Sequence, residues 1–101
     1  SYSDAHGWSD RAAASGLAGL QERTWRQRAY GDFWSHMLVA EGVVDIAAEP
    51  QLASYDMAAL VPVVREAGGR ITAFDGSDAL AGGSALTTNG ALHDEVLALL
   101  A

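Results

Sequence analysis

The stretch GVVDIAAEPQLASYDMAALVPVVREAGG, residues 42–69, decides the fold that we expect for this chain. Residues 43–49 alternate between two faces in a way that is typical of a strand, and Pro50 keeps the end of that strand extended. Apolar side chains then recur at helical spacing over 56–67, and the glycine pair that follows is a strong stop signal. The segment therefore predicts a strand followed by an amphipathic helix.

The helix predicted over 56–67 has a defined apolar face and one irregularity. Pro62 removes a backbone donor inside it, so we expect either a kink at this proline or an irregular first turn. The side chains that we expect to be buried are Met57, Leu60, Val61, Val64 and Ala67.

The sequence after this segment predicts two more strands and a closing helix. We expect strands over 70–74 and 85–88, a Gly-rich loop over 75–84 between them, and a helix over 93–100. Strands that alternate with helices indicate an α/β fold, here a layered sheet with flanking helices. No linker divides the chain, so residues 1–101 are expected to form a single domain. These patterns leave the order of the strands open.

A further helix is predicted immediately before the deciding segment. It begins at Asp32 and is stopped by Gly42, and Phe33, Met37 and Ala40 at i, i+4 and i+7 define its packed face. The elements expected further upstream are a short strand over 25–28 and a weak helix over 10–20.

Composition and charge narrow the classes of function. The 101 residues carry a formal net charge of -7, which argues against nucleic acid and anionic membranes as partners, because phosphate groups attract basic surfaces. The chain has no cysteine, which excludes a disulfide framework and a thiolate site. No apolar run is long enough to span a bilayer. A cytoplasmic protein is the default expectation, and the start at Ser1 without an initiator Met indicates a piece of a longer protein.

Four side chains stand out as candidates for chemistry. Asp56 opens the predicted helix, where a carboxylate can hold a divalent cation while nearby N–H groups face a phosphate; acids also occur there simply to offset the helix dipole. Glu49, seven residues earlier, fits a solvated acid at a strand end as well as a substrate ligand. Arg28 and Asp32 fit an ion pair in which Asp32 caps the next helix, and both readings stay open.

The order of these residues resembles the C-terminal half of the inositol monophosphatase family. In that family the pattern Trp-Asp-x-Ala-Ala opens the corresponding helix; here Tyr55 replaces the tryptophan, whereas Asp56, Ala58 and Ala59 match. The resemblance implies that Asp56 is a ligand of catalytic Mg²⁺ and that Glu49 reaches a hydroxyl or amine of the substrate. It also implies the C-terminal half of an α-β-α-β-α sandwich.

The run Arg28-Ala29-Tyr30-Gly31-Asp32 is more similar to the histidinol-phosphate phosphatase branch than to the inositol branch. Members of the inositol branch carry a small residue where Asp32 stands, and an extra carboxylate suits a substrate with an amine and an imidazole. By this resemblance Asp32 and Glu49 bind the cationic end of histidinol phosphate, and Arg28 orients the same wall of the pocket.

The resemblance thus implies a magnesium-dependent phosphatase that acts on a small phosphorylated metabolite. Histidinol phosphate is the expected substrate, in histidine biosynthesis, with inositol monophosphate or another small phosphate ester as the alternative. The groups that activate water and most metal ligands belong to the family's N-terminal half, so no certain catalytic residue lies in this segment. The missing half is an expected partner, and the segment alone is expected to be inactive.

Two further expectations concern assembly. A half-fold with exposed sheet surface favours self-association, so a homo-oligomer is expected. The alternative from another class is a noncatalytic binding or assembly domain that kept the half-fold and lost the chemistry.

Two other patterns are interpreted as structural. Asp75-Gly76-Ser77 matches part of the family's other metal motif, Asp-Pro-x-Asp-Gly-Thr, but lacks the Asp-Pro, so we interpret it as a turn. The histidines are too scattered to indicate a zinc site, and His36, between apolar neighbours on a helix, is expected to lie in the core.

Overall fold

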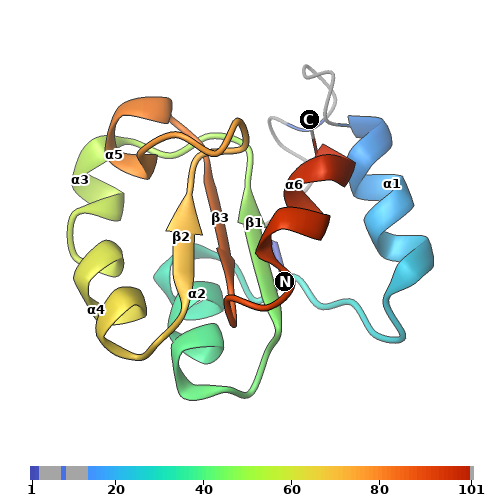
Figure 1. The fold of residues 1–101 in the computed structure, drawn as a ribbon, viewed down its shortest axis with the longest axis horizontal. Helices are drawn as coiled ribbons and strands as arrows, with labels where there is room; N and C mark the ends of the chain where they lie inside the picture. The colour runs from blue at the N-terminus through green and yellow to red at the C-terminus, as the bar shows by residue number, and fades with distance from the viewer. Residues whose placement is uncertain (3–7, 9–13, 101) are drawn as a thin grey trace.

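The computed structural model describes residues 1–2, 8 and 14–100 and is built on a small antiparallel sheet (Figure 1). Its strands are β1 (Ile46–Glu49), β2 (Arg70–Thr72) and β3 (Ala85–Thr88), in the order β1-β3-β2. The central strand β3 pairs antiparallel with both neighbours, and Thr87 lies opposite Ala47 on one side and Ile71 on the other. The predicted layered α/β fold is confirmed, and the sheet order is what the sequence patterns left open.

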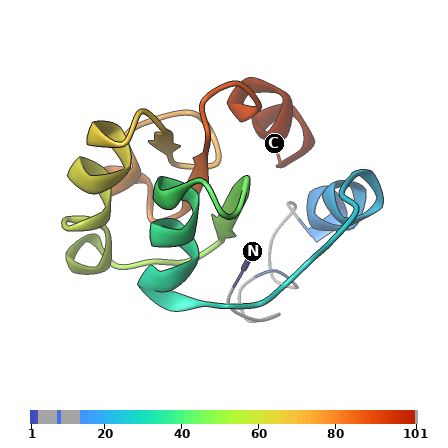
Figure 2. The same ribbon diagram turned by 90° about the horizontal axis from the view of Figure 1, so that it is seen from below.

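Helices cover both faces of this sheet, as Figures 1 and 2 show. On one face, α2 and α4 pack against each other and against the strands, while α6 packs on the opposite face with α1 outside it. The bounds of the helices are α1 Ala14–Arg23, α2 Asp32–Glu41, α3 Ser54–Met57, α4 Leu60–Glu66, α5 Ala79–Gly82 and α6 His93–Leu100.

Two apolar clusters, one on each face, hold the layers together. Between the sheet and α4 lie the buried residues Met57, Leu60, Val61, Val64, Ile71, Ala79 and Ala85. Between the sheet, α6 and α1 lie Trp8, Leu20, Ala48, Phe74, Leu86, Val96 and Leu100. Because successive strand residues point to opposite faces, neighbouring residues of β3 such as Ala85 and Leu86 contribute to different clusters.

Two consecutive threonines of β3 bind a buried histidine on each face. The Oγ1 of Thr87 lies 2.7 Å from Nδ1 of His36 on α2, and the Oγ1 of Thr88 lies 2.9 Å from Nδ1 of His93 on α6. Both imidazoles are fully buried. The central strand therefore fixes one helix on each face through a directional polar contact, beyond apolar packing. The expectation that His36 lies in the core is confirmed.

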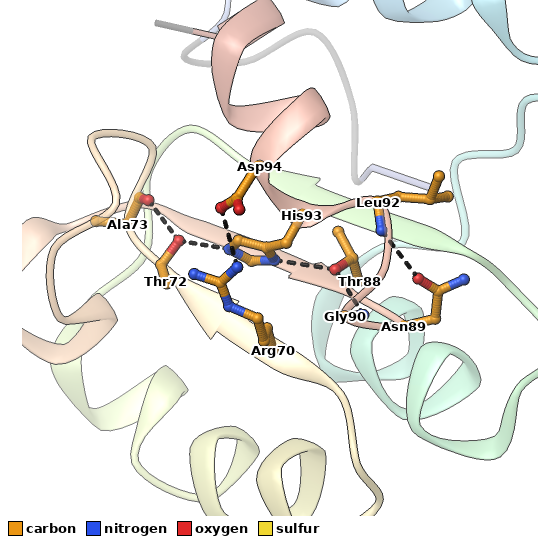
Figure 3. A network of polar contacts seen from close by, with 9 residues as sticks. All are labelled: Arg70, Thr72, Ala73, Thr88, Asn89, Gly90, Leu92, His93 and Asp94. Carbon is orange, nitrogen blue, oxygen red and sulfur yellow. Dashed lines mark hydrogen bonds and ion pairs between the residues drawn. The ribbon is translucent and has the colours of Figure 1, made fainter.

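The contacts around His93 assign its tautomer (Figure 3). The Thr72 hydroxyl donates to the carbonyl of Ala73 at 2.8 Å, so it can only accept from Nε2–H of His93, also at 2.8 Å. Nδ1 is then an acceptor for the hydroxyl of Thr88, which itself accepts from the N–H of Gly90 at 3.0 Å. The neutral ring is thus satisfied at both nitrogens and joins β2, β3 and α6.

The strand predicted over 25–28 is wrong. This segment has no strand structure, and the ring of Trp25 is 86% exposed. The side-chain amide of Gln27 donates to the carbonyls of Gln21 and Thr24, both at 2.9 Å, and so closes a turn after α1 in place of a ladder. The weak helix expected over 10–20 is observed as α1, and residues 10–13 of that prediction lie outside the described residues.

The strands predicted over 43–49 and 70–74 are real but shorter. The N–H groups of Val43 and Val44 donate to the carbonyl of Leu38 at the end of α2, where Gly42 has a φ of 84°, so the strand begins only at Ile46. At β2, the N–H of Ala73 donates to Ser77 in a turn, which ends the ladder. Within the loop predicted over 75–84, Asp78 caps the short helix α5 by accepting from Leu80. The strand over 85–88 and the helix over 93–100 are confirmed as predicted.

The helix predicted over 56–67 is divided into α3 and α4. Pro62 lies in the first turn of α4, where its missing N–H would have no intrahelical partner, so the irregular first turn expected from this proline is the observed outcome. The predicted apolar face is buried except for Ala67, which is exposed because α4 ends at Glu66.

The helix beginning at Asp32 is confirmed, but its buried face is rotated from the predicted one. Ser35, His36 and Val39 are buried, whereas Phe33 is 66% exposed. The hydrogen bond from His36 to the central strand turns α2 so that Phe33 faces away from the core.

No helix among the described residues is long and apolar enough to cross a membrane.

The buried histidines make the stability of the fold depend on pH. Burial lowers the pKa of His36 from 6.5 to about 4, with the Ser1 α-ammonium adding to the effect. Burial also lowers the pKa of His93, with the Arg70 guanidinium acting in the same direction and Asp94 against it. Between the lowered pKa of each histidine in the folded state and its ordinary value of about 6.5, the folded state binds fewer protons than the unfolded state. The free energy of unfolding therefore decreases as pH falls below about 6.5.

For His36 the loss would be on the order of 3 kcal/mol by pH 4. Urea unfolding at a series of pH values checks this, and His36→Asn, which keeps a polar group near Thr87 without titrating, should flatten the slope between pH 6.5 and 4. An unchanged slope in both His36→Asn and His93→Gln would contradict this account of acid sensitivity.

Candidate active site

Two of the predicted carboxylates line one cavity. Asp32, at the start of α2, and Asp56, in α3, share a hollow of about 330 Å³ with Phe33, Leu52 and Leu60. These residues come from helices that cover the same face of the sheet and from the loop before α3. Segments that are far apart in the sequence thus place two acids and an apolar wall around one space.

Asp32 reaches this cavity through an unusual backbone. Its φ is 51°, in the left-handed region that side chains rarely adopt, and the preceding Gly31 has a φ of 79°. Ser35 holds the turn: its hydroxyl accepts from the N–H of Gly31 at 2.9 Å, and its own N–H donates to the Gly31 carbonyl at 3.2 Å. Aspartate tolerates this conformation better than most residues, and strained positions gather at functional sites.

Asp56 is the third residue of α3 and is exposed. Its Oδ2 accepts a hydrogen bond from the N–H of Ala53 at 3.2 Å, which fixes the carboxylate at the start of the helix. A carboxylate has about four lone-pair positions, so this single contact leaves others for a ligand. The structural role and the ligand role of Asp56 are therefore compatible.

Glu49 lies close to this region but not on the cavity wall. It is 5% exposed at the end of β1, and strand alternation places it on the same face as Ala47 and Thr87, which is the face covered by α2 and α4. Burial lowers the pKa of the Ser1 α-ammonium, and the charge of the Glu49 carboxylate opposes part of this decrease. The structure thus places Glu49 on the sheet face covered by α2, the helix that carries Asp32, and by α4.

Arg28 is not brought to the cavity by the described residues. Its guanidinium is exposed and donates to the carbonyl of Gln27 at 2.7 Å, and its own carbonyl accepts from the N–H of Tyr2 at 3.3 Å. The role of Arg28 in orienting the pocket wall stays a prediction.

The donor set fits one side of a magnesium site. Among the described residues no group of three or more His, Cys, Asp or Glu side chains is placed to hold a metal ion. Mg²⁺ is commonly bound through one or two carboxylates together with waters and substrate phosphate oxygens, so Asp56 in a cavity that it shares with a second acid suits such a partial site.

Sequence reasoning missed the apolar side of the cavity. The helical spacing predicts packed faces for Leu60 and Phe33 and gives no signal for Leu52. In the structure, the N–H of Leu52 donates to the Gly83 carbonyl at 2.8 Å and so anchors the loop before α3. The available signal was the adjacency of Phe33 to Asp32, since both lie in the first turn of α2.

The Asp75-Gly76-Ser77 sequence forms the turn predicted for it. The Oδ1 of Asp75 accepts from the N–H of Ser77 at 2.9 Å and from its hydroxyl at 2.5 Å, and Gly76 has a φ of 86°. The side-chain hydrogen bond from Ser77 is the main cause that lowers the pKa of Asp75. This acid is engaged in its own turn.

The two roles of Asp56 can be separated by substitution. We expect Asp56→Ala to lower the free energy of unfolding by about 1 kcal/mol, because the N–H of Ala53 loses its acceptor. Asp56→Asn keeps an oxygen acceptor, so its free energy of unfolding should lie within about 0.5 kcal/mol of that of the unmodified chain. Urea denaturation of the three proteins makes the comparison, and equal losses in Ala and Asn would show that the charge, and not the cap, stabilises α3.

The chain matches a known family over its whole length. The sequence model of the inositol monophosphatase family covers residues 1–101. A histidinol-phosphatase of Mycobacterium tuberculosis is 57% identical over 100 residues, which are 99% of this chain and 38% of that protein. A histidinol-phosphatase of Streptomyces coelicolor is 48% identical over 99 residues, 98% of this chain and 37% of the relative. The chain thus spans less than half the length of these relatives, and both matches lie in their C-terminal half.

Solved structures agree with the fold. An IMPase of Thermotoga maritima superposes with a TM-score of 0.83 at 27% sequence identity. The match covers 98% of this chain and 38% of the Thermotoga chain. An inositol monophosphatase of Anabaena (Nostoc) sp. PCC 7120 gives a TM-score of 0.81 at 30% sequence identity. This match covers 98% of this chain and 41% of the Anabaena chain. The expected resemblance is confirmed in sequence and in fold: this chain belongs to the inositol monophosphatase family.

Proposed function

We propose that this chain is the C-terminal part of a magnesium-dependent phosphatase whose substrate is histidinol phosphate. The observation that carries the proposal is the cavity that Asp56 and Asp32 share. By the resemblance, Asp56 corresponds to the family's metal ligand, and Asp32 takes the place of a small residue of the inositol branch. The high identity to two proteins named histidinol-phosphatase supports the same substrate.

Each residue of the site has a chemical task in this proposal. Asp56 would hold Mg²⁺, and the bound ion would supply the positive charge that clamps a phosphate and lowers the pKa of an attacking water. Asp32 accepts hydrogen bonds from the cationic end of the substrate, and charge-assisted bonds of this kind are stronger than neutral ones. Glu49, buried beneath α2 and α4, contributes negative charge from below.

In this proposal a substrate lies across the cavity. The phosphate would lie toward Asp56, which would hold the metal, and the amine and imidazole would lie toward Asp32, the first residue of α2, whose φ is 51°. Leu52 and Leu60 exclude water from one wall. The remaining metal ligands and the group that activates the attacking water would come from the part of the protein that precedes this chain.

The substrate proposal is tested by phosphate release from the parent-length protein. With Mg²⁺ present we expect turnover of histidinol phosphate to exceed that of inositol monophosphate, and Asp56→Asn to lower kcat at least a hundredfold because a metal ligand loses its charge. Removal of Mg²⁺ with a chelator should have the same effect as the substitution. Equal turnover of both esters would favour a general small-ester phosphatase, and release by neither would contradict the enzyme proposal.

Asp32 is the residue on which substrate preference should depend. Asp32→Asn is the informative change, because asparagine tolerates a φ of 51° and differs mainly in charge. We expect kcat/KM for histidinol phosphate to fall about tenfold or more, the value of one charge-assisted hydrogen bond, with little change for inositol monophosphate. A parallel loss for both esters would assign Asp32 to the scaffold.

The chain by itself is expected to be inactive. One metal-binding carboxylate cannot complete a two-metal site, and among the described residues no three-ligand group is present. Purified residues 1–101 should release phosphate far below roughly 1 per second, the low end of ordinary enzyme turnover. A rate at or above that level would show that the segment carries a complete site.

A further inference from the structure

Phe33 is an exposed aromatic ring on the cavity wall. It is 66% exposed, directly follows Asp32, and is the one aromatic side chain among the described residues that line the cavity. The other apolar lining residues, Leu52 and Leu60, are aliphatic, and Leu60 is buried. A large apolar ring that is not packed into the core, beside a carboxylate in a hollow of about 330 Å³, is suited to contact a ligand.

The exposure of Phe33 follows from the way in which α2 is anchored. His36 binds Thr87 of the central strand at 2.7 Å, and Ser35 is buried at the turn with Gly31. These contacts fix the rotation of α2, so Phe33 cannot turn inward without breaking them. The ring is therefore held in place at the cavity by contacts that the next residues of the same helix make with the sheet and with Gly31.

An aromatic face beside a carboxylate matches one kind of ligand group, a flat nitrogen heterocycle. Aromatic rings prefer offset-stacked or edge-to-face partners, and a cation over the ring face is attracted by its quadrupole. A carboxylate next to the ring accepts hydrogen bonds from ring N–H groups. An inositol ring, which is saturated and carries only hydroxyl groups, would gain little from such a face.

We propose that Phe33 is a specificity-determining residue that stacks against the imidazole of the substrate while Asp32 binds its charged groups. The inference rests on the proposed function, because it needs a phosphate ester that carries a planar heterocycle. It assigns to Phe33 a contribution to substrate binding and none to the chemical step.

The test uses the parent-length protein with Mg²⁺ and two esters that differ only in the ring. Histidinol phosphate carries the imidazole, whereas 2-aminopropyl phosphate has the same amine and phosphate without it. The variants are Phe33→Leu, which removes the aromatic face, and Phe33→Tyr, which restores it. Trp34→Leu is the matched control, since Trp34 is the next residue of α2, is 52% exposed and contacts the ring of Tyr30 at a tilt of 56°, with ring centroids 5.3 Å apart.

We expect Phe33→Leu to raise KM for histidinol phosphate roughly threefold to tenfold, the worth of an aromatic pair, with kcat within about twofold. KM for the ring-free ester should not change, Phe33→Tyr should behave as the unmodified protein, and Trp34→Leu should leave both esters unaffected. Inhibition by the product histidinol should weaken in Phe33→Leu by the same factor.

Three outcomes would overturn the inference. An equal change of KM for both esters, or no change for either, would show that Phe33 does not contact the imidazole of the substrate. A fall in melting temperature for Phe33→Leu that Phe33→Tyr restores, without a change in KM, would instead assign the ring to packing against the rest of the protein. Absence of histidinol phosphate turnover in the unmodified protein would contradict the proposed function itself, and the inference with it.

Discussion

The paired contacts from the central strand to its two helical layers are the constraint on which the structure depends. Thr87 and Thr88 are neighbours in β3, so strand alternation sends their hydroxyls to opposite faces, and each binds a buried imidazole, His36 on α2 and His93 on α6. Apolar packing tolerates sliding, whereas hydrogen bonds fix direction and distance. A short sheet with modest apolar side chains thereby obtains defined helix positions.

One of these contacts also shapes the candidate site. With His36 directed at the sheet, the first turn of α2 presents Asp32 and Phe33 to the cavity, and α3 brings Asp56 to it from the other side. Pro62 contributes as well, because a proline at this position disfavours one continuous helix over α3 and α4, and Asp56 lies in the separate short helix α3. Scaffold and site are thus coupled through the rotation of one helix and the interruption of another.

Much of this architecture was predictable from local signals, and the rest depends on tertiary contacts. The glycine after α2, the strand over 85–88 and the helix over 93–100 follow from turn chemistry and periodicity, and the acids at 32 and 56 follow from their place at helix starts. The burial of His36 follows from its apolar neighbours on the helix, but the exposure of Phe33 could not be predicted, because it depends on the contact between His36 and Thr87 of the central strand. The extended segment at 25–28 misled for a related reason, since strand propensity without a ladder partner does not make a strand.

The central proposal is that Asp56, through a bound metal ion, and Asp32 hold opposite ends of one substrate in one cavity. It is tested most directly by a crystal structure of the parent-length protein grown with Mn²⁺ and histidinol, with anomalous diffraction recorded to locate the metal. The account predicts an anomalous peak within coordination distance of an Asp56 oxygen, about 2.0 to 2.3 Å, and the histidinol amine or imidazole on the Asp32 carboxylate. A metal bound without Asp56, or histidinol bound away from Asp32, would contradict it.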